Sequence, residues 1–181
     1  LVRSTVYGRG LEDRDSPVSL CQIEVAAYTG FRYCVAANSY TSALFLALKA
    51  AGVGCGAHVL GNSVTSLQVP AAVRHAGGKF ISIGNTQELF IDVLDLVQKV
   101  SQTRCRCLVI SHTYGQIPNM DEVSVICKQY GITLIEDCSN SLGNFRGSQH
   151  VGHHGAACCF SGEQGTILGV GPPNGGGGGS E

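Results

Sequence analysis

The chain has 181 residues, of which 44% are hydrophobic and only 14% are charged, and its formal net charge is −1. This length is enough for one domain with a sizeable core. The 12 lysine and arginine residues are scattered, which argues against nucleic acid as a partner because that binding needs concentrated positive charge. The sparse charge instead indicates a surface covered in part by the rest of a larger fold or by a partner protein.

The nine cysteines and the first residue bear on the compartment. Several cysteines lie in apolar runs such as CRCLVI and AACCF, where small buried residues belong, and the chain does not resemble a short, disulfide-rich secreted domain. We therefore expect an intracellular, reducing compartment. Because the first residue is Leu rather than Met, we also expect missing chain upstream, such as a targeting segment removed in an organelle. No apolar run reaches the about 20 residues of a membrane-spanning helix.

The first half of the chain predicts helices and strands in alternation. Ser16 and Pro17 mark the start of a helix and Gly30 marks its end. The apolar run RYCVAAN predicts a buried strand over 32–38, and TSALFLALKAAG predicts a helix over 41–52. These are followed by a strand over 57–61, a helix over 65–76 and the strand KFISIG.

The second half continues the alternation. We expect a helix over 92–100, a strand over 105–111, a helix ending at Gly131, and strands over 132–137 and 156–161. The strands are solid apolar runs rather than alternating ones, which is typical of a parallel sheet covered on both faces. The sequence therefore predicts an α/β fold with a mostly parallel sheet and helices on both faces.

Polar residues follow three of the strands, at the edge where sheets of this kind bind ligands. The stretch NSYTSA enters a helix whose free N–H groups favour an anion, with Ser39, Thr41 and Ser42 as further donors. Alternatively, Ser39 or Thr41 only caps the helix.

The other two polar positions are a pair of carboxylates and a serine. Glu136 and Asp137 could bind a metal, act as acid and base, or hold a cationic ring nitrogen, and the alternative is a helix cap for residues 138–142. Ser161, at the end of the last strand, could contact the same anion as Thr41.

Two further patterns are weaker. The stretch HVGHH and the pair Cys105 and Cys107 do not match a zinc-ligand spacing, so we expect no metal site. The stretch GVGCGA fits a dinucleotide-binding pattern only superficially, because it follows a helix and precedes a strand, the reverse of the required order.

Taken together, several stretches resemble the DegT/DnrJ/EryC1/StrS group of pyridoxal phosphate (PLP)-dependent sugar aminotransferases, a branch of the aspartate aminotransferase fold. They are AAYTGFRYCVAANSYTSALFLALKAAGVGCG, SHTYGQIPNMDEV, YGITLIEDCSNSLGNFRG and GHHGAACCFS, in that order. The resemblance implies the large domain of a PLP-dependent transferase, without the small C-terminal domain. We accordingly expect an N-terminal extension over 1–15, an incomplete aminotransferase-like large domain over 16–168 and a flexible glycine-rich tail over 169–181.

The resemblance also implies a cofactor site. Thr41 and the backbone at Tyr40 would lie at the cofactor phosphate, with Ser161 as a second phosphate ligand. Asp137 would pair with the ring nitrogen, and Asn140 falls where the family usually has a Gln near the ring hydroxyl.

The chain departs from the family at three positions of that site. Thr166 stands where the family has the lysine that forms the Schiff base with PLP, and a threonine hydroxyl cannot form an imine. Ser66 falls where an aromatic ring stacks on the cofactor, and Tyr40 replaces a glycine that lets the backbone approach the phosphate. The four lysines are expected away from the site: Lys49, Lys79, Lys99 and Lys128.

These departures lead to the hypothesis of a catalytically inactive aminotransferase-like domain that binds no cofactor. It would serve as a structural or accessory subunit of a larger protein assembly, or as part of a dimer. The alternatives are an active PLP-dependent aminotransferase acting on a keto-sugar nucleotide, a phosphate or nucleotide-sugar binding module, and an isolated fragment of an ordinary enzyme.

Overall fold

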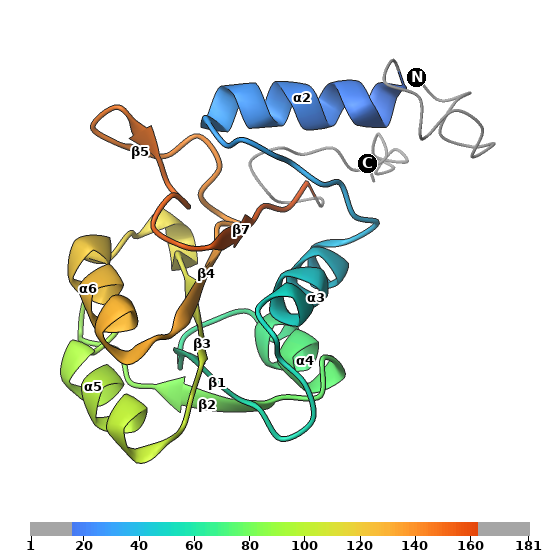
Figure 1. The fold of residues 1–181 in the computed structure, drawn as a ribbon. Coiled ribbons are helices and arrows are strands. Elements are labelled where there is room, and N and C mark those ends of the chain that lie inside the picture. The colour runs from blue at the N-terminus through green and yellow to red at the C-terminus, as the bar shows by residue number, and fades with distance from the viewer. Residues whose placement is uncertain (1–15, 163–181) are drawn as a thin grey trace, which may run out of the picture.

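The computed structural model describes residues 16–162, which form a parallel sheet between two layers of helices (Figure 1). The expected extension over 1–15, the tail over 169–181 and Thr166 lie outside the described residues. The five strands are β1 (His58–Asn62), β2 (Lys79–Ile83), β3 (Cys107–Ser111), β4 (Thr133–Asp137) and β7 (Ala157–Cys159). All neighbouring pairs are parallel, in the order β2-β1-β3-β4-β7, which confirms the expected α/β fold.

The helices begin and end close to the residues that the sequence indicates. They are α2 (Pro17–Thr29), α3 (Tyr40–Ala50), α4 (Gln68–His75), α5 (Val93–Gln102) and α6 (Met120–Tyr130). Ser16 caps α2 through its side chain, and Gly30 ends the helix at a φ of 77°. Gly131 ends α6 in the same left-handed conformation, which glycine adopts without steric cost.

Successive strand residues point to opposite faces of the sheet and form two separate cores. Leu108 and Ile110 of β3 pack with α5 and α6, whereas Cys107 and Val109 pack with α3 and α4. Figure 1 shows these two helix pairs on opposite sides of the sheet. The solid apolar strands are therefore explained by burial on both faces.

Two segments differ from the expectation. Residues 32–38 do not form a buried strand: they connect α2 to α3 as an irregular extended segment, and Tyr33 and Val35 are each 74% exposed. Its backbone makes no ladder with a neighbouring strand, and the N–H of Ala36 bonds instead to the Gln22 side chain at 2.7 Å.

The second difference is a small hairpin that the sequence analysis missed. It consists of β5 (Phe145–Arg146) and β6 (Gln149–His150), which are antiparallel and joined through Gly147 at a φ of 65°. Within residues 16–162, none of the helices has the length and apolar character needed to cross a membrane.

Candidate functional site

The carboxyl edge of the sheet is the place where this topology can hold a ligand. The order of the strands reverses between β1 and β3, and crevices of open parallel sheets form at such a switch point. The strands end there at polar residues: Asn62 on β1, Ser111 on β3 and Asp137 on β4.

The switch point itself is closed by its own side chains. The Asn62 side chain accepts from the Ser111 N–H at 3.0 Å and donates to the Ser111 carbonyl at 3.2 Å. The hydroxyls of Thr65 and Ser111 are 2.6 Å apart. Asn62 and Ser111 were missed in the sequence analysis, although each is a polar residue at the end of an apolar strand.

The N-terminus of α3 reaches the same edge. Ser39 is the N-cap, and its hydroxyl accepts from the N–H of Ser42 at 3.1 Å, so the capping interpretation of this stretch is confirmed for Ser39. Tyr40 and Thr41 are the next two residues; Tyr40 is buried and Thr41 is partly buried.

The Tyr40 side chain runs from α3 into the interior. It is 3% exposed and packs in the core formed by α3, α4 and the sheet. Burial strongly raises the pKa of Tyr40, and the charge of the Asp137 carboxylate raises that pKa further. Tyr40 therefore belongs to the core in which α3 packs against β4 and β7.

Glu136 and Asp137 do not form a carboxylate pair, because adjacent residues of β4 point to opposite faces. Asp137 faces the α3 side, and its Oδ1 accepts from the N–H of Ser139 at 3.1 Å. Residues 138–142 form turns rather than a helix, so the expected helix cap is also wrong.

Glu136 faces the α6 side and is fully buried. Its Oε2 lies 2.8 Å from His112 Nε2, and its Oε1 accepts from the N–H groups of His154 at 2.8 Å and Gly155 at 2.6 Å. Burial by itself would raise the pKa of Glu136, but the hydrogen bond and charge of His112 and the N–H of Gly155 lower it overall.

The remaining predicted site residues are spread over the same end of the fold. Ser161 is 6% exposed and lies two residues after β7, the strand against which α3 packs. Asn140 and Ser66 are exposed, and the Asn140 amide lies 3.5 Å from the Ser139 hydroxyl.

All four lysines of the chain lie within the described residues, and none is at this edge. Lys49 lies in the last turn of α3 and donates to the carbonyls of Val53 and Ala76. Lys79 begins β2 at the opposite edge of the sheet. Lys99 pairs with Asp95 along α5, and Lys128 lies in the last turn of α6.

The histidines of HVGHH diverge rather than converge. His150 Nε2 accepts from the Gly143 N–H, His153 stacks on Phe31, and His154 lies against Asp121. Among residues 16–162, the group that comes close enough to hold a metal ion is His112, Glu136 and Cys138, all buried. The Glu136 carboxylate of this group is bonded to the three protein groups described above.

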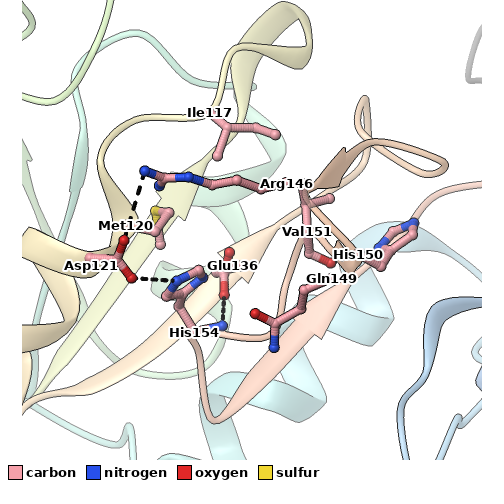
Figure 2. A pocket seen from close by; sticks show the side chains of 9 residues that line it. All are labelled: Ile117, Met120, Asp121, Glu136, Arg146, Gln149, His150, Val151 and His154. Carbon is pink, nitrogen blue, oxygen red and sulfur yellow. Dashed lines mark hydrogen bonds and ion pairs between the residues drawn. The ribbon is translucent and has the colours of Figure 1, made fainter.

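A cavity of about 220 Å³ lies on the α6 side of β4, beside the β5–β6 hairpin (Figure 2). Asp121 lies 3.7 Å from Arg146 and 3.2 Å from the His154 ring on its wall, and Glu136 lines it as well. Asp121 is thus paired with Arg146 and His154, and Glu136 is paired with His112. The cavity is on the face of β4 opposite to Asp137, so it is separate from the edge at which α3 begins.

Comparisons with known proteins agree with this architecture. A dTDP-3-amino-3,4,6-trideoxy-alpha-D-glucose transaminase of Micromonospora megalomicea is 28% identical over 167 residues, covering 92% of this chain and 43% of that protein. An L-glutamine:2-deoxy-scyllo-inosose aminotransferase of Streptomyces fradiae is 32% identical, covering 79% of this chain and 34% of that protein.

Solved structures match in fold as well. The crystal structure of S. venezuelae DesV in complex with a ketimine intermediate is 27% identical, with a TM-score of 0.77, covering 90% of this chain and 45% of that one. A 3-amino-5-hydroxybenzoic acid synthase matches with a TM-score of 0.80 at 23% identity, covering 91% of this chain and 43% of that one. The chain thus spans less than half the length of these relatives. The model of the DegT/DnrJ/EryC1/StrS aminotransferase family matches residues 19–171, and the chain belongs to that family.

Proposed function

We propose that this chain is a non-catalytic member of the family, which works without covalently bound PLP and serves as an accessory subunit of a larger protein assembly. The observation that carries the proposal is that none of the four lysines, all of which lie within residues 16–162, is placed at the candidate site. PLP supplies an electron sink for carbanion chemistry when it is bound, and its enzymes hold it as an imine of a lysine. Thr166 stands at the position that the resemblance assigns to that lysine.

The placement of the lysines supports the proposal. Lys49 and Lys79 belong to the end of the fold opposite Asp137, since one ends α3 and the other begins a parallel strand. The Lys99 amine is held 2.7 Å from Asp95, and Lys128 lies on α6, across the sheet from α3. None of the four lysines therefore lies at the carboxyl edge beside Asp137.

The surroundings of Asp137 do not fit PLP either. The position that would stack a ring on the cofactor is the exposed Ser66, which has no ring to offer. The space between the α3 N-terminus and Asp137 contains the buried Tyr40 side chain. A cofactor would meet neither an amine nor a stacking surface, and its ring would compete with Tyr40.

The accessory role is supported by the apolar surface around α2. Only Thr29 of this helix is buried, and Leu20 and Ile23 are 46% and 60% exposed. The segment that follows adds Tyr33 and Val35, both largely exposed. In Figure 1 this helix lies along one side of the sheet and its two helix layers. Several exposed apolar side chains on one helix and the segment after it indicate contact with other protein.

Two alternatives are each favoured by one feature. Asp137 and Ser161 lie at the sheet edge where the resemblance places a cofactor, as an active aminotransferase for a keto-sugar nucleotide would need. That reading requires an amine from outside this chain. The start of α3, with Thr41 beside it, favours a phosphate or nucleotide-sugar module, and calorimetric titration with sugar nucleotides tests that reading.

Absorption spectroscopy tests the main proposal. The purified chain is mixed with PLP, and L-glutamate is then added as amino donor. The proposal expects only the spectrum of free PLP, unchanged by the protein, and no amino transfer to keto-sugar nucleotides. A protein-bound imine band that shifts with the donor would contradict it. The native mass of the protein from its natural source tests the accessory role, because a lone monomer would contradict that part.

A further inference from the structure

Tyr40 occupies an unusual position for a tyrosine. It is the first residue of α3, where a side chain normally points to solvent, yet it is 3% exposed. It belongs to the core of α3, α4 and the sheet, together with Val109 of β3, Ile135 of β4 and Cys159 of β7. α3 packs against β4 and β7, and its first residue is part of the core that these strands share with the helix.

The hydroxyl of Tyr40 lies near Asp137. Asp137 pairs in the sheet with Cys159, which belongs to the same core as Tyr40, and among the described residues Asp137, Cys159 and Cys138 act on the hydroxyl through their charge. The Asp137 carboxylate also accepts from the N–H of Ser139 at 3.1 Å. The chain thus satisfies a 3% exposed carboxylate from within itself.

We propose that Tyr40 is a built-in substitute for the cofactor, whose ring fills the volume of the pyridine ring and whose O–H replaces the pyridinium N–H at Asp137. The inference deepens the proposed function, on which it rests, because it says what keeps the site intact when no PLP is present. It also makes a separate claim: the wild-type site is closed to the pyridine ring even without imine chemistry.

The Tyr40 side chain both fills the core and provides a polar group near Asp137. A glycine here would leave a void in a packed core, and voids lose both transfer free energy and contacts. The same glycine would also remove the phenol from beside the buried Asp137 carboxylate, and a polar group left without partners costs more when it is buried than when it is exposed. A ligand that entered the wild-type site would have to displace the phenol from the core, and the phenol would lose its packing contacts there.

The test uses pyridoxine 5′-phosphate, which carries the ring, its nitrogen and the phosphate but has no aldehyde to react with amines. Binding is measured by calorimetry and by the shift in melting temperature, for the wild type and for Tyr40→Gly, Tyr40→Phe and Leu44→Ala. Leu44 is fully buried one turn further along α3, so Leu44→Ala opens a matched cavity away from Asp137. Inorganic phosphate is titrated in a parallel arm.

Tyr40→Gly is expected to lower the melting temperature by roughly 10 °C, since it removes a buried aromatic side chain. Pyridoxine 5′-phosphate should then bind this variant at least tenfold more tightly than inorganic phosphate and restore several degrees of the loss. The wild type and Tyr40→Phe, which both keep the ring, should not bind it. Leu44→Ala should be destabilised without being rescued.

Wild-type binding of pyridoxine 5′-phosphate at micromolar concentration would overturn this inference and leave the non-catalytic proposal standing. Equal affinity of Tyr40→Gly for the ligand and for inorganic phosphate would also overturn it, because only an anion site would then be present. If Tyr40→Gly does not fold alone, its refolding is compared with and without the ligand, and a yield that the ligand leaves unchanged contradicts the inference. An imine band with PLP would instead contradict the proposed function.

Discussion

Replacement of Glu136 is expected to destabilise the fold strongly, although the residue lies on the far face of the sheet from Tyr40. Its carboxylate joins β4 to His112, which follows β3, and to the backbone of His154 and Gly155, which precedes β7. Glu136→Ala leaves two backbone N–H groups and a buried imidazole without their acceptor. Breaking a buried pair of this kind costs about 3–5 kcal/mol.

Glu136→Gln removes the charge of the side chain but keeps its size and shape. The amide oxygen can still accept from His154 and Gly155, while the NH₂ group faces His112 Nε2. The imidazole must then carry its proton on Nδ1, which is buried without a partner among the described residues. We expect a loss of about 1–3 kcal/mol, because hydrogen bonds to a charged acceptor are the stronger ones. Glu24→Gln, on the exposed surface of α2, is the matched control and should stay within about 0.5 kcal/mol.

The direction of the Glu136 pKa shift predicts how folding stability changes with pH. The pKa of Glu136 is lower in the folded chain than in the unfolded one, so its stabilisation is present above the unfolded pKa of about 4.3 and is lost as the pH falls through the folded pKa. Urea unfolding followed by circular dichroism at several pH values measures this. The difference between wild type and Glu136→Gln should shrink in acid. A Glu136→Ala loss below about 0.5 kcal/mol, or a difference that grows in acid, would refute the reasoning.

Three further outcomes follow from the same structure. Thr166→Lys alone should give no amino transfer in a coupled assay, because Tyr40 and Ser66 still exclude the ring, and measurable turnover would contradict this. Above the unfolded tyrosine pKa of about 10, wild type should lose stability relative to Tyr40→Phe by up to about 1.4 kcal/mol per pH unit. The reason is that the folded chain keeps the Tyr40 proton that the unfolded chain releases. Urea unfolding at alkaline pH measures this, and a difference between the two proteins that stays constant with pH would contradict the prediction. Burial raises the pKa of Cys107 and Cys159 to about 12, so at mildly alkaline pH a thiol reagent followed by peptide mapping should label the exposed Cys21 and Cys55 first. Early labelling of Cys107 would contradict the packing.

The order of the helices and strands could be read from the sequence because most boundaries are set locally. Gly30 and Gly131 end helices through their own left-handed conformation, and the apolar strands need only burial on both faces. The run over 32–38 has the same composition as a buried strand, but a strand also needs a neighbour to pair with. The hairpin at Phe145–Arg146 and Gln149–His150 is too short to leave any periodic pattern.

The site could be located from the sequence but not resolved into its parts. Asp137 ends a strand and Ser161 follows one, so the sheet edge was predictable, whereas the separation of Glu136 from Asp137 depends on which face of β4 each residue takes. Tyr40 was recognised as bulk at the phosphate end. That its side chain turns inward to Asp137 depends on packing between α3 and three strands, which no local pattern encodes.

Chemical trapping tests most directly whether any lysine of this chain forms an imine with PLP. The folded chain is incubated with an equimolar amount of PLP and reduced with borohydride, which converts any imine into a stable pyridoxyl adduct. Intact mass and peptide mapping then report its amount and position. We predict no stoichiometric adduct on Lys49, Lys79, Lys99 or Lys128. One pyridoxyl group per chain on a single lysine would show that the chain holds the cofactor covalently, and the non-catalytic account would be wrong.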